Sequence, residues 1–298
     1  MMVDLIAEAT GHRHGLLTPP VDVPVSAADV AGVFHTSVAK EGEEFRSAGV
    51  GVARGHRVAQ LAAVGEALER YAATHATLPL RKASEVRSEA SVSFDSWTLH
   101  SATQRQRSDY PHHDAFPNDP WLTRCHDLRT NTPTWVPAAL VSLVDDFGAL
   151  ATSSGLAADP DPYKAMLRAL QEVVERDAYM TTWLHQVGGR LVNEGPIDER
   201  LGGERRVYDL TPAFSPHPVA LVTGSLSLAG HPRHSLGVAC RSSWDDAVER
   251  ATLEMLQGTM FVGQLLHRRP DLHGMAAEAV TGFDEHAIYY AANPDEWA

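Results

Sequence analysis

The stretch Ala165-Met-Leu-Arg-Ala-Leu-Gln-Glu-Val-Val-Glu-Arg176 contains a spacing of alanine and glutamate that occurs three times in the chain. In each copy an alanine is followed four residues later by a second alanine, and three residues after that by a glutamate. The copies are Ala59, Ala63 and Glu66; Ala165, Ala169 and Glu172; and Ala247, Ala251 and Glu254. A short apolar run containing glycine precedes each copy, at 49–53, 155–157 and 237–239. The pattern predicts a strand, a glycine-bearing connection and a helix, repeated three times.

The first two copies continue with a second glutamate and an arginine, as Glu69-Arg70 and Glu175-Arg176. The third copy has Gln257 where the second glutamate would stand, and it supplies Arg250 one helical turn before Glu254. Residues three or four apart share one face of a helix, so the two glutamates of a copy point the same way.

If the three helices converge, five carboxylates meet in one place, and buried carboxylates require compensating cations. Magnesium suits such a cluster, because it prefers oxygen ligands and commonly shares its shell with nucleotide phosphates. Arginines on the same helices would hold the phosphates. The predicted metal ligands are Glu66, Glu69, Glu172, Glu175 and Glu254, and the predicted phosphate-binding residues are Arg70, Arg176 and Arg250. The alternative is a solvated helix face with internal ion pairs.

Several motifs together resemble the YcaO family, an ATP-using group that activates peptide backbone amides. The matching segments are Gly65-Glu-Ala-Leu-Glu-Arg-Tyr71, Ala151-Thr-Ser-Ser-Gly-Leu-Ala-Ala158, Leu170-Gln-Glu-Val-Val-Glu-Arg-Asp-Ala178 and Arg250-Ala-Thr-Leu-Glu254. Trp135-Val-Pro-Ala-Ala139 and Met180-Thr-Thr-Trp183 resemble stretches of its heterocycle-forming members. The similarity runs from about residue 15 to about residue 294, nearly the whole chain.

The resemblance implies a YcaO-like α/β fold of the α+β type, formed as a single domain over 1–298, with ATP and Mg²⁺ as cofactors. It assigns the five glutamates to magnesium and nucleotide, and Arg176 and Arg250 to phosphate and catalysis. The other implied nucleotide-binding residues are Lys40, Ser47, Ser154 and Gln257, of which Lys40 and Ser47 are placed by their order in the chain.

The implied reaction is cyclodehydration in the biosynthesis of ribosomally made natural products. A Cys, Ser or Thr side chain of a precursor peptide adds to the preceding carbonyl, ATP phosphorylates the resulting oxyanion, and loss of phosphate leaves an azoline, the precursor of thiazole and oxazole. Thioamide or amidine formation at the same nucleotide site remains open. No leader-peptide-binding module is recognisable, so a separate protein is expected to recruit the peptide, and a homodimer is left open.

Of the departures from the family pattern, Ser154 and the missing tail support another class, a catalytically weak scaffold subunit. Ala63 and Ser154 stand where the family often has serine and asparagine. Azoline-forming members usually continue into a proline-rich tail, whereas this sequence stops at Asp295-Glu-Trp-Ala298.

Composition restricts the remaining choices. A net charge of −13 without a basic run argues against nucleic acid and anionic membranes as partners. Cys125 and Cys240 are isolated, which favours a reducing, cytoplasmic location and no disulfide, with a catalytic cysteine as the alternative. His112-His113-Asp114 reads as an exposed loop, and Ser153-Ser154-Gly155 lacks the context of a nucleophilic serine.

Turn and cap residues predict the boundaries of the elements. The helices are expected over about 55–75, from the Asp161-Pro162 start to about 186, and from the Ser243 and Asp246 cap to about 267. Strands are expected at 134–137, 139–144, 150–158, 206–210, 218–223 and 235–240.

Overall fold

A computed structural model of the chain describes residues 5–11, 15–23, 34–38, 48–86, 90–93, 96–97, 100–110, 117–143, 150–198, 202–228, 231–272, 274–293 and 296. The chain divides into two compact units, and the region predicted to form one domain contains both. The first unit comprises residues 1–67 and 154–298, and the second comprises residues 68–153. We describe each unit by itself.

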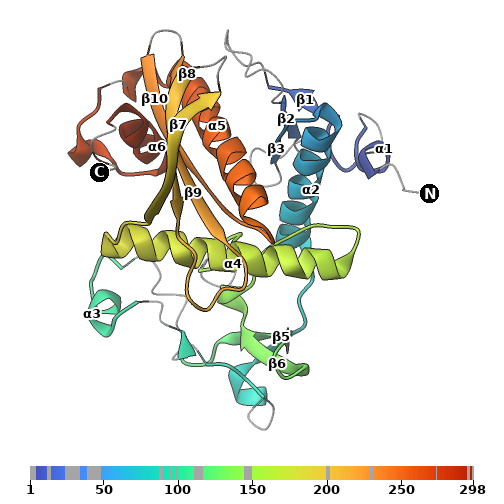
Figure 1. Ribbon diagram of the computed structural model, residues 1–298. Helices are drawn as coiled ribbons and strands as arrows, with labels where there is room; N and C mark the ends of the chain where they lie inside the picture. The colour runs from blue at the N-terminus through green and yellow to red at the C-terminus, as the bar shows by residue number, and fades with distance from the viewer. Residues whose placement is uncertain are drawn as a thin grey trace. The chain divides into compact units, whose positions relative to one another are not determined.

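The first unit begins with a short helix, a small sheet and a long helix. These elements are α1 (Leu5–Ala9), β1 (Val21–Asp22), β2 (Phe34–Val38), β3 (Gly49–Ala53) and α2 (His56–His75), whose last residues belong to the second unit. After residue 153 the first unit resumes with α4 (Pro162–His185), β7 (Arg190–Asp198), β8 (Gly202–Asp209), β9 (Val219–Leu228), β10 (His231–Cys240), α5 (Trp244–Arg268) and α6 (Phe283–Ala292). Strands β1 to β3 form one antiparallel sheet, and β7 to β10 form another in the order β10-β9-β8-β7 (Figure 1).

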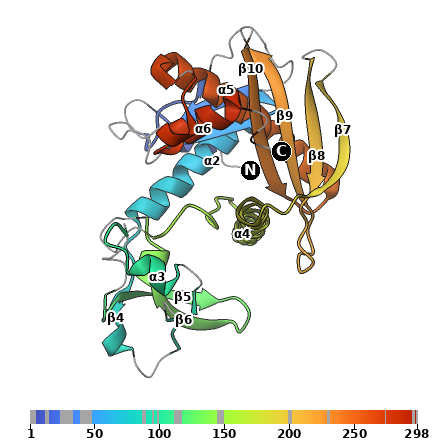
Figure 2. The ribbon, with the colours of Figure 1, turned by 90° about the vertical axis from the view of Figure 1, so that its left-hand side faces the viewer.

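Helices α4 and α5 cover opposite faces of the larger sheet. Successive residues of a strand point to opposite faces, so neighbouring residues of β9 contact different helices. On β9, Ala220 and Val222 pack against α5, whereas Val219 and Leu221 pack with Ala178 of α4. Helix α6 packs on β10 and on the second half of α5 (Figure 2). Its Tyr290 ring lies 5.2 Å from the ring of Trp183 on α4, so α6 also contacts that helix.

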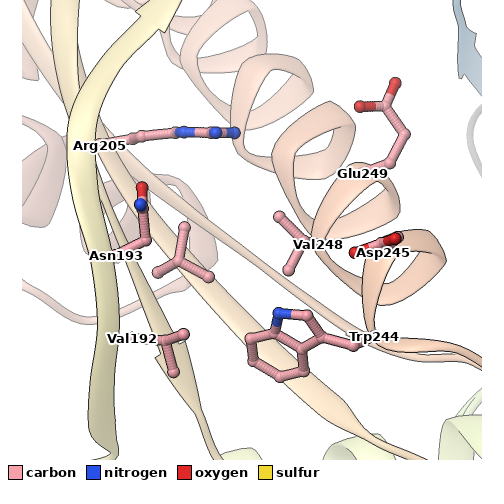
Figure 3. Close-up of a pocket in the computed structure, with 8 residues that line it drawn as sticks. Val192, Asn193, Arg205, Trp244, Asp245, Val248 and Glu249 are labelled. Atoms are coloured by element: carbon pink, nitrogen blue, oxygen red, sulfur yellow. The ribbon is translucent and has the colours of Figure 1, made fainter.

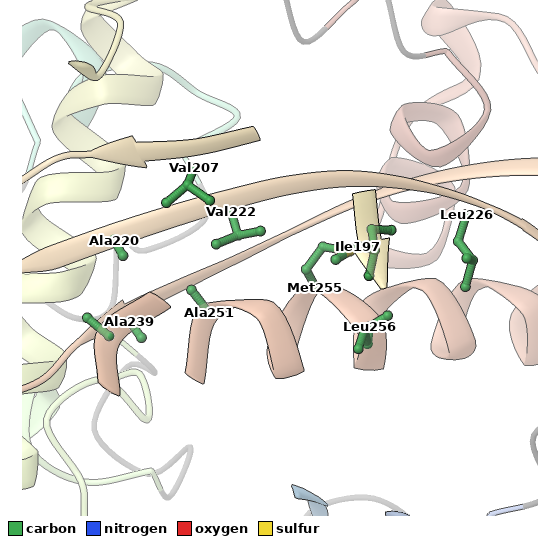
Figure 4. Close-up of a cluster of buried hydrophobic side chains, with 10 residues drawn as sticks. Ile197, Val207, Ala220, Val222, Leu226, Ala239, Ala251, Met255 and Leu256 are labelled. Carbon is green, nitrogen blue, oxygen red and sulfur yellow. The ribbon is translucent and has the colours of Figure 1, made fainter. Parts of the chain in front are cut away.

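The core between α5 and the sheet is built from one side of the helix. Met255 and Leu256 of α5 are almost fully buried between the helix and the sheet, together with small residues such as Ala220, Ala239 and Ala251 (Figure 4). The alanines of the third repeat therefore form the contact of α5 with the sheet, and their small size lets the two backbones approach closely.

At two strands a glycine is required for a helix backbone to lie this close. A Cβ added to Gly237 would overlap the carbonyl oxygen of Ala251 and lie 2.6 Å from the amide nitrogen of Met255. A Cβ added to Gly51 would overlap the carbonyl oxygen of Ala59 on α2. Gly49, Gly155 and Gly237 each stand 17 positions before the first glutamate of their repeat, so the repeats match in glycine as well as in alanine and glutamate.

We expect Gly237→Ala to lower the free energy of unfolding by about 3 kcal/mol, because strand β10 would have to move away from the backbone of α5. Gly195→Ala is the matched control, since a Cβ there would meet nothing within 4 Å. Urea unfolding followed by circular dichroism measures both variants. Equal stability of the two variants would show that β10 and α5 are not in contact at Gly237.

The predicted helix boundaries are confirmed at the caps. The Asp161 carboxylate accepts a hydrogen bond from the Tyr163 amide at 2.9 Å, and Ser243 Oγ accepts one from the Asp246 amide at 3.2 Å. At the other end of α4, Gln186 adopts a left-handed conformation with φ of 52° and ends the helix. Short polar side chains before the first turn therefore start both long helices where the sequence indicates.

The second unit contains a small antiparallel sheet and little helix. Its elements are the end of α2, β4 (Leu80–Lys82), α3 (Ala102–Arg105), β5 (Trp121–Asp127), β6 (Thr132–Pro137) and single turns of 3₁₀ helix at Ala83–Glu85 and Ala138–Leu140. Strand β5 lies between β4 and β6, and Asn131, with φ of 56°, turns the chain between β5 and β6. Val86, Leu122 and Trp135 form its buried cluster.

Two strand predictions are wrong, and one strand was not predicted. The second repeat has no strand at 150–158: the chain there is irregular, and Gly155 has a φ of 87°, which is not an extended conformation. Residues 139–143 also form no strand, because Ala138–Leu140 continue into a 3₁₀ turn. Strand β7 was not predicted from the sequence, since Gly195 and Pro196 interrupt its pattern.

No helix in the described part of the chain is both apolar enough and long enough to cross a membrane. The histidine group at 112–114 lies outside the described residues.

Candidate nucleotide and metal site

The first glutamates of two repeats are anchored to the backbone that precedes their own helices. On α2, Glu66 Oε2 accepts a hydrogen bond from the Val50 amide of β3 at 2.9 Å. On α4, Glu172 Oε2 accepts one from the Gly155 amide at 3.3 Å. In the third repeat a Cβ on Gly237 would lie 2.8 Å from Cβ of Glu254, so the strand again lies against the glutamate. In all three repeats the glutamate thus lies against the segment that carries the equivalent glycine.

Glu172 interacts with the first glutamates of both other repeats. Burial raises the pKa of its carboxyl, and the neighbouring charges of Glu254 and Glu66 raise it further. Arg176 and the Gly155 amide lower it, but not enough to cancel the effect of burial. Glu66 on α2 and Glu254 on α5 therefore each lie within electrostatic reach of Glu172 on α4.

Glu175 is the most buried of these carboxylates, with 7 % of its surface exposed. Its Oε2 accepts a hydrogen bond from the Cys240 amide at 3.0 Å and lies 3.9 Å from a terminal nitrogen of Arg241. Burial, followed by the charge of Glu254, raises its pKa to about 7, while the Cys240 amide, Arg241 and Arg176 oppose that rise. The side chain connects α4 to the end of β10.

The predicted arginines lie beside the glutamates. Arg250 Nε is 3.0 Å from Glu254 Oε1, and Arg250 Nη1 donates to the Val52 carbonyl of β3 at 3.3 Å. Arg176 Nη2 is 3.5 Å from Glu172 Oε1. Because both guanidiniums remain partly exposed, they can still bind an anion on their free sides.

Arg241 belongs to this site, although the sequence analysis did not identify it. Its Nη1 donates to the Cys240 carbonyl at 2.6 Å, and its side chain is 19 % exposed. Burial lowers its pKa, and the nearby cations Arg250 and Arg168 lower it further. Its place directly after β10 was the available signal, since strand ends in the repeat face the glutamates.

The donor set fits magnesium in its chemistry. Within the described ranges, no group of three or more His, Cys, Asp or Glu side chains is arranged to hold a metal ion. Magnesium usually keeps several waters and takes only one or two carboxylates together with phosphate oxygens, so it does not need such a group. Glu66, Glu172 and Glu175 each use Oε2 for a backbone amide, so Oε1 is the candidate ligand atom of each. In Glu172 and Glu175 this atom lies 3.5 and 3.9 Å from Arg176, which would have to yield to the metal ion.

The other predicted site residues are located only by their position in the chain. Gln257 is half-buried on α5, one turn beyond Glu254, and Ser154 is exposed next to Gly155. Glu69 and Arg70 follow Glu66 on α2, but both belong to the second unit. Lys40 and Ser47 lie outside the described residues. The roles of all these residues remain predictions.

The fold and the site define a mixed α/β protein with carboxylates and arginines from three repeats in one region. The sequence model described as "YcaO cyclodehydratase, ATP- and Mg²⁺-binding" matches residues 50–298. The chain therefore belongs to the YcaO family, whose cofactors are ATP and Mg²⁺. No curated protein matches the chain in sequence.

Several solved structures share the fold. A heterocyclase in complex with substrate and cofactor has a TM-score of 0.71 and 17 % identity, covering 94 % of this chain and 41 % of its own. YcaO from Methanopyrus kandleri, bound with AMPPCP and Mg²⁺, has a TM-score of 0.60 and 19 % identity, covering 85 % of this chain and 63 % of its own. The E. coli microcin synthetase McbBCD complex has a TM-score of 0.63 and 14 % identity, covering 93 % of this chain and 72 % of the matched chain. The chain thus spans less than two thirds of the first two proteins.

Proposed function

We propose that this protein uses ATP and Mg²⁺ to activate backbone amides in a ribosomally made precursor peptide, and that it converts Cys, Ser or Thr residues to azolines. The observation that carries the proposal is that Glu66 and Glu254, from two other helices, lie within electrostatic reach of Glu172, with Arg176 beside Glu172 and Arg250 beside Glu254. Family membership supports it, and so do the heterocyclase and the microcin synthetase among the proteins of similar fold.

In this proposal the chain mainly positions the reactants and stabilises charge, as in other phosphoryl transfers. Glu66, Glu69, Glu172, Glu175 and Glu254 are the residues that would hold magnesium, which would supply positive charge against the phosphates. Arg176 and Arg250 hold the phosphoryl group during transfer. Lys40, Ser47, Ser154 and Gln257 complete the contacts to the nucleotide.

The reaction needs no reactant besides the peptide and ATP. The substrate thiol or hydroxyl loses its proton and adds to the preceding carbonyl carbon, the carbonyl oxygen takes the γ-phosphoryl group from ATP, and ADP leaves. The C–O bond to that phosphorylated oxygen then breaks, phosphate departs and the ring nitrogen loses its proton. One water is lost from the peptide for each ring, and its oxygen leaves in the phosphate.

The test is mass spectrometry of a precursor peptide incubated with the protein, ATP, Mg²⁺ and the separate protein proposed to recruit the leader. We expect loss of one water per modified residue and one ADP for each ring. A product in which sulfur or nitrogen replaces an amide oxygen would assign thioamide or amidine chemistry instead.

The second candidate is a scaffold subunit that binds nucleotide without modifying the peptide. Ser154, exposed beside Gly155 in place of the asparagine common in the family, favours it because an amide contact to nucleotide is lost. Unchanged peptide together with measurable nucleotide binding in the same experiment would support this candidate and contradict the first.

A further inference from the structure

A cavity of about 410 Å³ lies between the edge of the larger sheet and the start of α5 (Figure 3). Strands β7 and β8 line one side of it, and the first turns of α5 line the other. Trp244, Val248 and Thr252 follow one another at helical spacing on this side of α5, whereas Arg250, Glu254 and Gln257 follow on another. The cavity is therefore separate from the candidate nucleotide site.

The floor of the cavity is apolar. Val207 is buried, Val248 and Trp244 pack partly on the core, and Val192 keeps 44 % of its surface exposed. The pairing of β7 with β8 shifts register between Leu191 and Asn193. Such a bulge re-aims side chains, and Figure 3 shows Val192 and Asn193, which are consecutive, both on the side facing α5. The apolar side chain of Val192 and the side-chain amide of Asn193 therefore both line the cavity.

Arg205 supplies a cation without a matching anion. One terminal nitrogen donates to Thr252 Oγ1 at 3.3 Å, and the buried Nε has no hydrogen-bond partner. Across the described part of the chain no carboxylate pairs with Arg205. Glu249 lines the same cavity but forms its ion pair with Arg54 at 2.9 Å. Asp245 lies in the first turn of α5, where the helix terminus stabilises its charge.

We propose that this cavity, the Arg205 pocket, binds a peptide segment in which an acidic residue stands next to a large apolar residue. The apolar side chain packs on Trp244, Val192 and Val248, and the carboxylate accepts hydrogen bonds from Arg205 and Asn193. A peptide occupant rests on the proposed function, in which the protein acts on a precursor peptide. The pocket would hold that peptide at a point away from the reacting residue.

The test uses three synthetic probes, acetyl-Phe-Glu-amide, acetyl-Phe-Gln-amide and acetyl-Ala-Glu-amide, added to the full chain. The readout is the NMR signal of the Trp244 indole N–H, identified with Trp244→Phe. We expect acetyl-Phe-Glu-amide to shift this signal, and each of the other two probes to bind about tenfold more weakly, as the loss of one charge-assisted hydrogen bond or one buried ring implies. Equal binding of the Glu and Gln probes would overturn the proposal.

Matched variants on β8 separate the pocket from a general charge effect. Arg205→Met should abolish the shift of the Trp244 signal, whereas Arg206→Met should keep it. Arg206 is the next residue of the strand, so its side chain points to the opposite face of the sheet, where its Nε lies 3.9 Å from Glu194. An equal loss in both variants would contradict the assignment, as would AMP competing for the same signal. Glu172→Gln should leave probe binding unchanged, so a failure of the nucleotide site and a failure of the Arg205 pocket give different results.

Discussion

Replacing Glu172 with glutamine is expected to weaken magnesium-dependent nucleotide binding by about 100-fold or more, while the protein stays folded. The substitution keeps the shape of the side chain and an oxygen that can accept the Gly155 amide hydrogen bond. It removes the negative charge that Mg²⁺ requires and the partner of Arg176. Isothermal titration with a non-hydrolysable ATP analogue, with and without MgCl₂, measures the effect.

The control for that substitution is Glu194→Gln on β7, where the carboxylate is exposed and 3.9 Å from Arg206. This control changes the net charge by the same amount as Glu172→Gln. It should not change nucleotide affinity, because solvent screens the exposed ion pair of Glu194 and Arg206. Folding of Glu172→Gln should be preserved, since burial already disfavours the ionised carboxyl there. Unchanged affinity in Glu172→Gln would refute the metal and nucleotide assignment of this residue.

The repeat made the long helices and their glutamates predictable from the sequence. Alanine and glutamate at helical spacing behind a capping Asp161 or Ser243 are local signals, and local signals decide where a helix starts. The matched glycines, each 17 positions ahead of a glutamate, indicate that a strand or loop must lie against the helix. That the carboxylates come near one another follows from repetition of the same unit.

What the sequence did not predict depends on contacts between distant segments. Strand β7 forms because β8 offers it hydrogen bonds, and its own pattern is broken by Pro196. The second repeat lacks its strand because Gly155 turns the backbone to donate to Glu172 instead of continuing a ladder. Arg241 joins the site through the buried Glu175, 66 positions earlier. Its place directly after β10 marks it as a candidate, but no local pattern identifies Glu175 as its partner.

Glu175→Gln is expected to change how the stability of the metal-free protein depends on pH. The pKa of Glu175 is raised from 4.5 to about 7 in the folded protein, so its contribution is fully present below pH 4.5 and is lost as pH rises through 7. At 1.36 kcal/mol per pKa unit, burying the ionised carboxylate costs at most about 3 kcal/mol at pH 8. Part of this cost belongs to the facing charge of Glu254, and Arg241 and Arg176 reduce it.

The variant should therefore match the native protein near pH 4.5 and exceed its free energy of unfolding by up to about 3 kcal/mol at pH 8. Glutamine retains an acceptor for the Cys240 amide, so the link between α4 and β10 survives. Urea unfolding in EDTA at pH 4.5, 6 and 8 measures the difference, and parallel curves for the two proteins would show that Glu175 does not titrate in this range. If the variant gains stability but loses magnesium-dependent nucleotide binding, the carboxyl at position 175 serves function at a cost in stability, because Mg²⁺ binds the ionised carboxylate and releases its proton.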